Sequence, residues 1–249
     1  MDPAIVDPLA LLLIFITLAL GSLSKGITGV GLPVLAIPVL ANVFGVERAV
    51  VVLVLPGLIS NLWLIWVHRR EAPLARRLAP FLLFGIAGGV IGTWLLSAAS
   101  PVLLNRLLAL WLGLYLLLLL TRPQFRIPGA ERLSPLFGLI AGITQGATGI
   151  SAPIIAPFLT SLGLVRQQFV FAIALAFTLL AIGQMSAILH YGLLTPQRLV
   201  EGLVALIPVM LFLPLGARLG RRISPRGFAR LLVVVLLAME ARLLWISFA

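Results

Sequence analysis

The sequence contains no cysteine, two histidines and only seven acidic residues among its 249 positions. Without cysteine the chain has no disulfide framework, no iron–sulfur cluster and no thiolate metal site. Two histidines without thiols make a poor site for a transition metal. We therefore predict no metal site and no cofactor.

Charged residues are also scarce, at 10% of the chain, whereas hydrophobic residues make up 61% and the mean hydropathy is +1.20. Apolar runs at 9–20, 50–67 and 107–120 approach the roughly 20 residues that span about 30 Å of hydrocarbon. This composition excludes a water-soluble domain and predicts an all-α polytopic membrane protein in a lipid bilayer. The net charge of +11 comes from arginine clusters between the apolar runs, which are typical of membrane topology signals and not of nucleic-acid binding.

One motif rich in glycine and proline occurs twice inside apolar sequence. The first copy, residues 25–33, reads KGITGVGLP and contains the only lysine of the chain. The second copy, residues 145–153, reads QGATGISAP, so that Gln145 stands where the first copy has Lys25. A duplicated helix-breaking motif at membrane depth indicates a transport site.

The duplication extends over nearly the whole chain. Residues 45–48 (GVER) are matched by residues 163–166 (GLVR), and Gly92 is matched by Gly216. We therefore divide the chain into repeat 1, residues 1–127, and repeat 2, residues 128–249, which together form one transport domain. Each repeat is predicted to contain a Gly/Pro-broken helix or a re-entrant hairpin plus about three full spans, and the sequence does not decide between hairpin and kinked span.

The positions of the arginines predict how the repeats are oriented. If each glycine-bearing segment enters the membrane and returns, the arginine-rich loops at 68–77, 122–132 and 218–226 lie on one face. The positive-inside bias makes that face cytoplasmic. The basic loop of repeat 1 then lies opposite its neutral counterpart in repeat 2, so we predict inverted topology. Eight plain spans would instead put the loop at 68–77 on the face opposite the other two clusters.

Broken helices at membrane depth expose backbone N–H groups that protein, water or a ligand must satisfy. A helix beginning at Gly26 or Gly146 would direct free amides and the positive end of its dipole at the break, where glycine leaves room for an oxyanion. We predict a cradle for a small anionic substrate there, and the alternative is that these glycines only permit tight helix packing. The predicted substrate-binding residues are Lys25, Gly26, Thr28, Gly29, Gly31, Asn61, Gln145, Gly146, Thr148, Gly149, Ser151 and Gln184.

Three of these polar residues have a second interpretation. A lysine at the bilayer centre costs about 2.5–3.5 kcal/mol on insertion scales, so Lys25 either serves the substrate or snorkels to the interface at the end of a short helix. Asn61 and Gln184 lie inside apolar runs, where their amides either bind substrate oxygens or bridge helices.

The acidic residues predict how transport is energised. Most lie in loops or at the ends of apolar runs, and Glu201 and Glu240 have Arg198 and Arg242 nearby. No carboxylate relay for protons is evident. An inside-negative potential favours outward anion movement by about 2.3 kcal/mol per charge per 100 mV, which makes export downhill without a coupling ion.

Two other functions compete with transport. Residues 149–152 (GISA) weakly resemble a serine-nucleophile motif, with His190 as base, and would make an intramembrane serine protease; however, Ser151 aligns with Gly31 of the other copy. A structural role in the membrane is the third interpretation. We predict that the chain is not an enzyme and has no catalytic residues.

Taken together, these features resemble the sulfite exporter TauE/SafE family. The residues that carry the resemblance recur in both halves: the motif copies at 25–33 and 145–153, Gly45 and Gly163, His190 before Gly192, and Gly92 with Gly216. The resemblance implies a multi-pass carrier of the bacterial inner membrane that exports small sulfur-containing anions, such as sulfite, sulfonates or sulfoacetate-like compounds, by alternating access. Transport of small carboxylates and import are the alternatives.

The chain also departs from the family pattern. Pro56 stands in repeat 1 where repeat 2 has Thr178, and residues 151–152 (SA) replace residues 31–32 (GL). The family is usually described with seven or eight spans, which agrees with our count only if the extra segments are re-entrant. The anion, the coupling ion and whether the chain forms a homo-oligomer stay open.

Overall fold

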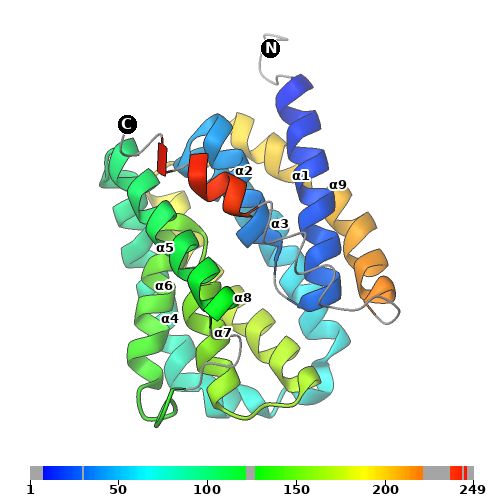
Figure 1. The fold of residues 1–249 in the computed structure, drawn as a ribbon, viewed down its shortest axis with the longest axis vertical. Helices are drawn as coiled ribbons and strands as arrows, with labels where there is room; N and C mark the ends of the chain where they lie inside the picture. The colour runs from blue at the N-terminus through cyan, green and yellow to red at the C-terminus, as the bar shows by residue number, and fades with distance from the viewer. Residues whose placement is uncertain (1–7, 30, 122–126, 221–235, 243, 246–249) are drawn as a thin grey trace.

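The computed structural model describes residues 8–29, 31–121, 127–220, 236–242 and 244–245 (Figure 1). Every regular element within these residues is a helix, which confirms the predicted all-α class. The helices are α1 (Pro8–Thr28), α2 (Leu32–Phe44), α3 (Val46–Val67), a short 3₁₀ turn (Arg69–Glu71), α4 (Leu74–Ala98), α5 (Pro101–Thr121), α6 (Ser134–Thr148), α7 (Ala152–Ser161), α8 (Arg166–His190) and α9 (Pro196–Leu219). Residues 236–242 are also helical.

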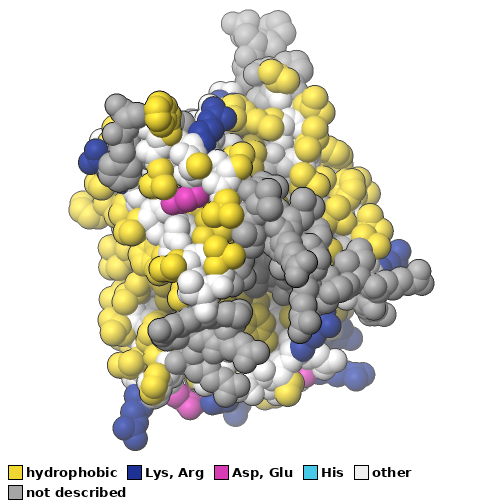
Figure 2. All heavy atoms as spheres, viewed as in Figure 1, with side chains coloured by type: hydrophobic (Ala, Val, Ile, Leu, Met, Phe, Trp, Pro, Cys, Tyr) yellow, Lys and Arg dark blue, Asp and Glu magenta, His cyan; other side chains and the backbone are white. Residues whose placement is uncertain are grey.

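Five helices are long and apolar enough to cross a membrane: α3, α4, α5, α8 and α9. The three full spans predicted for the first half are therefore present. The second half shows two, and the last apolar run of the sequence, which would form the third, lies mostly outside the described residues. Large hydrophobic side chains such as Leu83, Trp94, Leu110 and Met210 are exposed and form broad apolar areas on the outer surface (Figure 2), as expected for contact with lipid.

The two halves of the chain are interleaved. Helix α1 packs along α9, and α6 packs along α4, so each half contributes its first helix to the other half. In Figure 1, α1 and α9 lie side by side at one edge and α4, α5 and α6 lie together at the other. Helix α3 contacts both α8 and α9, and α4 contacts α8. The interface between the halves therefore runs through the interior of the protein.

Glycine allows α6 and α4 to approach backbone to backbone. A Cβ atom added at Gly142 of α6 would lie 2.7 Å from the backbone nitrogen of Gly89 and 2.8 Å from the Cα of Gly88 in α4. One at Gly146 would lie 2.6 Å from the backbone nitrogen of Thr93. Separations below 3.0 Å leave no room for any side chain. This is the close approach that small residues at four-residue spacing permit in membrane helices.

The α1–α9 contact uses the corresponding glycine of the first motif copy. A Cβ at Gly26 would lie 2.7 Å from the carbonyl carbon of Gly216 in α9, and one at Gly216 would lie 2.9 Å from the Cα of Leu23 in α1. Gly26 and Gly146 thus both face a neighbouring helix, which is the tight-packing alternative considered from the sequence.

The breaks in the two motif copies lie further along the chain than predicted. Helix α1 continues through Gly26 to Thr28, and α6 continues through Gly146 to Thr148, so the expectation of a helix beginning at either glycine is wrong. The chain breaks at Gly29 and at Gly149, whose φ angles of 82° and 70° favour glycine. The helices after the breaks, α2 and α7, have 13 and 10 residues and reach only about 20 and 15 Å, so neither crosses the membrane by itself.

Two ion pairs join the first turns of α3 and α9. Arg48 of α3 donates to both carboxylate oxygens of Glu201 in α9, with 3.1 Å between its Nε and Glu201 Oε2, and Glu201 is fully buried. Arg198 of α9 pairs with Glu47 of α3 at 2.7 Å. The sequence placed Arg198 near Glu201, but the carboxylate that Arg198 pairs with is Glu47. The pairs tie the two halves of the chain together at this end of the bundle.

We predict that Gly142→Ala lowers the melting temperature of the detergent-solubilised protein, because its methyl group overpacks the α4–α6 contact, at a cost of about 1–3 kcal/mol. Gly57→Ala in α3 is the matched control, since a Cβ at Gly57 meets nothing within 4 Å. Thermal unfolding should separate the two variants clearly. Equal stability of both variants would contradict the packing described for α4 and α6.

Candidate functional site

A cavity lies where the two motif copies meet α3 and α8. Its lining comes from both halves of the chain and includes Lys25 of α1, Asn61 of α3, Gln145 of α6, Gly149 at the second break and Gln184 of α8. The remaining wall is apolar and consists of Pro33, Ile37, Val50, Leu53, Val54, Gly57, Leu58, Phe177 and Ala181. The space open to the centre of a water molecule is about 30 Å³, room for about two ordered waters. The cavity is therefore small in this conformation.

Lys25 is buried against α3, with 1% of its surface exposed. Its Nζ donates to Ser60 Oγ at 2.8 Å and to Asn61 Oδ1, and Ser60 in turn donates to the carbonyl of Gly57 at 2.7 Å. No carboxylate in the described part of the chain lies within ion-pair distance of Nζ. The burial contradicts the interpretation of Lys25 as a snorkelling residue. An ammonium has three donors, and two of them have protein acceptors here.

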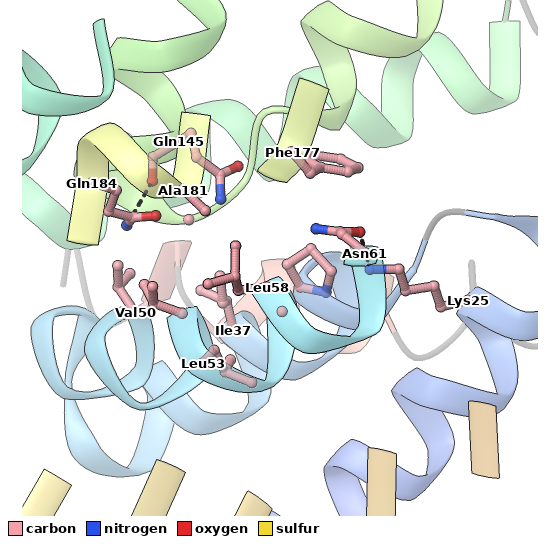
Figure 3. Close-up of a pocket in the computed structure, with 14 residues that line it drawn as sticks. Lys25, Ile37, Val50, Leu53, Leu58, Asn61, Gln145, Phe177, Ala181 and Gln184 are labelled. Carbon is pink, nitrogen blue, oxygen red and sulfur yellow. Dashed lines mark hydrogen bonds between the residues drawn. The ribbon is translucent and has the colours of Figure 1, made fainter. Parts of the chain in front are cut away.

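The second half places two amides at the other side of the cavity. Gln184 of α8 is fully buried, and its Nε2 donates to the backbone carbonyl of Gln145 at 3.2 Å. Gln184 Oε1 is buried without a hydrogen-bond partner among the described residues. The Gln145 side chain accepts a hydrogen bond from Ser151 Oγ at 2.7 Å. In Figure 3 these glutamines face Lys25 and Asn61 across the cavity.

Hydrogen bonding turns two of these amides so that their NH₂ groups remain available. An ammonium only donates, so Asn61 must offer its oxygen to Lys25, which leaves its NH₂ group for another acceptor. The oxygen of Gln145 is likewise occupied by Ser151. Figure 3 shows the NH₂ groups of Asn61 and Gln145 directed inward and those residues on opposite sides of the cavity. The site is therefore rich in donors and carries one positive charge, which suits a small anion.

The cavity brings together five of the predicted site residues: Lys25, Asn61, Gln145, Gly149 and Gln184. At Gly149 a Cβ would lie 3.4 Å from Val50 Cγ2, so the second break packs directly on α3. All five residues were predicted from the sequence, as polar residues or motif glycines within apolar runs.

The other predicted residues hold the breaks in place and do not line this cavity. Thr148 Oγ1 donates to the carbonyl of Thr144 at 2.8 Å and accepts from the amide of Ile150. Gly31 packs against Ser24, and Gly29 against Val170 of α8. Ser151 is fully buried and supports Gln145, while Gly26 and Gly146 make the helix contacts described above. The side chain of Thr28 lies outside the described residues.

Ser60 and Phe177 are among the residues at the site that were not predicted from the sequence. Ser60 accepts a hydrogen bond from Lys25, and Phe177 contributes to the apolar wall. Ser60 precedes Asn61 in the same apolar run, and this adjacency of two polar residues was a usable signal. Phe177 has no distinguishing signal, because phenylalanine is common in such helices.

The serine and the histidine of the protease interpretation do not come together in the structure. Ser151 donates to Gln145, whereas His190 is exposed at the end of α8 with its ring against Tyr191. Within the described ranges, no group of three or more His, Cys, Asp or Glu residues could hold a metal ion.

Comparison with known proteins identifies the family. The family model for Sulfite exporter TauE/SafE matches residues 13–243, nearly the whole chain. No curated protein and no solved structure matches the chain. The match includes both motif copies and every residue that lines the cavity. The chain therefore belongs to the TauE/SafE family of sulfite exporters.

Proposed function

We propose that the protein moves small sulfur-containing anions across the membrane through the cavity between its two motif copies. One observation carries the proposal: a buried ammonium with no carboxylate partner among the described residues faces a cavity that also receives the NH₂ groups of two amides. Lys25, Asn61 and Gln145 are the substrate donors in this proposal, and Gln184 positions Gln145 through its backbone carbonyl.

The electrostatics favour an anion over a neutral substrate. A lysine at membrane depth costs about 2.5–3.5 kcal/mol on insertion scales, and here two neutral oxygens are its only protein partners within the described residues. A bound anion would neutralise the charge and accept a charge-assisted hydrogen bond, which is worth about 1.5–3 kcal/mol. In the part of the chain that the structure describes, no carboxylate pairs with Lys25 and would compete with such an anion.

Membership of the TauE/SafE family favours sulfur-containing anions as the substrates. Sulfite and sulfonates present three oxygens around one sulfur atom, and the site offers three donor groups: Lys25 and Asn61 on one side of the cavity and Gln145 on the other. A carboxylate has only two oxygens, but together they accept about four hydrogen bonds, so the three donors do not exclude it. Transport of short carboxylates is therefore the alternative that substrate competition must test.

We further propose that the two halves are inverted repeats and that transport proceeds by alternating access. The packing supports this proposal, because the main contacts between the halves have counterparts with the halves exchanged: α1 with α9 and α6 with α4, then α3 with α9 and α8 with α4. Lys25 with Asn61 in one half also corresponds to Gln145 with Gln184 in the other. Alternating access would open this small cavity to one side of the membrane at a time.

The orientation that we propose puts the arginine-rich loops in the cytoplasm of a bacterium. The loop at 68–77 and the end of α9 then share the cytoplasmic side, in agreement with the positive-inside bias. An inside-negative potential drives anions outward by about 2.3 kcal/mol per charge per 100 mV. Export of the anion is the downhill direction and needs no coupling ion.

Replacing the buried charge tests the proposed site. We expect Lys25→Met to slow sulfite efflux from proteoliposomes at least about tenfold, because a charge-assisted hydrogen bond to the anion is lost. The melting temperature should stay the same or rise, since the variant removes a buried charge that has no carboxylate partner.

Ser60→Ala is the matched control for this substitution, since it removes a neutral partner of Lys25 and keeps the ammonium. Its efflux should remain within about threefold of the wild type, because the ammonium keeps its charge-assisted hydrogen bond to the anion. Normal efflux by Lys25→Met, with sulfite efflux established for the wild type, would reject the site.

A second measurement tests the energetics. Sulfite efflux should accelerate when a potassium gradient with valinomycin makes the interior of the liposome negative, because net negative charge leaves. Imposed proton or sodium gradients at constant potential should change the rate little. Strict dependence on either gradient would show that a coupling ion is required.

A further inference from the structure

A second and larger cavity lies beside the first one and plays no part in the site described so far. Its volume is about 260 Å³. It is lined by the end of α1, the end of α3, the beginning of α8 and one residue of α9: Gly26, Ile27, Gly29, Trp63, Leu64, Val67, His68, Arg166, Gln167, Val170 and Ala217. Gly26 follows Lys25 directly in α1, so the end of α1 contributes to both cavities.

The charged wall of this second cavity is cationic. Arg166 is exposed, and no carboxylate in the described part of the chain lies within ion-pair distance of its guanidinium. His68, just beyond the end of α3, is partly buried. Burial lowers the pKa of His68, Glu71 raises it, and the positive charge of Arg166 lowers it again. Arg166 is therefore close enough to His68 to lower the pKa of its imidazole.

The corresponding arginine of the first half has a different environment. Residues 45–48 match residues 163–166, so Arg48 is the counterpart of Arg166. Arg48 is bound by the buried carboxylate of Glu201. At the offset that relates Gly216 to Gly92, the counterpart of Glu201 is Arg77, which pairs with Glu131 instead. Arg48 thus joins two helices through its ion pair, whereas Arg166 lines an open cavity.

We propose that the second cavity is an anion-binding vestibule, with Arg166 as its anion ligand, from which a small sulfonate or related oxyanion passes to Lys25. This role as a vestibule rests on the transport function proposed above. The vestibule lies on the side of the basic loop at 68–77, the side from which export would begin. The counterpart arginine of the first half, Arg48, is held by Glu201 and is therefore not free to bind an anion.

The absence of cysteine from the natural chain provides a test that does not depend on transport. Val170→Cys introduces one thiol in the vestibule, one helical turn after Arg166. The thiolate attacks a methanethiosulfonate reagent, a mixed disulfide forms and methanesulfinate leaves. The anionic 2-sulfonatoethyl reagent is itself a small sulfonate, and the 2-(trimethylammonium)ethyl reagent is its cationic match. The measured quantity is the ratio of their two labelling rates, normalised to a free thiol in solution.

We expect Val170→Cys to favour the anionic reagent and Arg166→Gln in the same background to lower the ratio at least about fivefold, because one unit charge close to the thiol is lost. Arg166→Lys should retain most of the preference. Sulfoacetate should protect the thiol when Arg166 is present and not in Arg166→Gln. Gln167→Cys repeats the measurement from a second lining position if Val170→Cys does not fold.

Arg70→Gln is the matched control, since Arg70 is an exposed arginine of the basic loop that does not line the cavity. It should change the ratio less than about twofold, because an exposed charge at longer range is screened by salt. If Arg70→Gln and Arg166→Gln lower the labelling ratio equally, or if neither lowers it, the vestibule proposal is wrong.

The labelling and transport results can fail separately. Loss of the labelling preference in Arg166→Gln together with normal efflux by Lys25→Met would keep the anion pocket and reject the transport site. The reverse result would keep the transport site and reject the vestibule.

Discussion

Close contact between glycine-bearing helix faces decides where the polar groups of this protein point. Successive residues of an α-helix are about 100° apart around its axis. With Gly26 held against the backbone of α9, the preceding residue, Lys25, is turned toward α3 and the cavity. Gly146 against α4 does the same for Gln145. The glycines of the motif thus act on a substrate indirectly, because they fix the rotation of the helices that carry the donors.

Charge is buried in two different ways in this chain. Arg48 and Glu201 neutralise each other, and such a pair holds helices together without calling for a ligand. Lys25 has only neutral oxygens around it in the described residues, so its charge is solvated but not balanced. The energetic cost of a buried charge is tolerated where it serves binding, and the difference between these two arrangements separates the structural ion pair from the candidate site.

The sequence predicted the all-α class, the duplicated breaks and most of the polar residues at the cavity, because each leaves a local signal: apolar runs, glycine with proline, and an amide or lysine within an apolar run. It did not predict that the breaks fall at Gly29 and Gly149, since several neighbouring glycines are equally able to end a helix. It also could not assign Glu201 to Arg48, because that pairing joins residues 153 positions apart. Whether Gly26 and Gly146 contact a ligand or a helix depends on the rotation of helices, which a motif does not encode.

The pairing of α1 with α9 has a consequence for how the chain is assembled. A ribosome releases α4 before α6, so α6 enters a bilayer in which its glycine-lined partner is already present. Helix α1 is synthesised first, yet the partner of its Gly26, at Gly216, emerges about 190 residues later. The hydrogen-bond partners of Lys25, Ser60 and Asn61, belong to α3 and emerge much earlier than α9. Docking of α1 onto α9 is therefore a late step of biogenesis that follows the contact between Lys25 and α3.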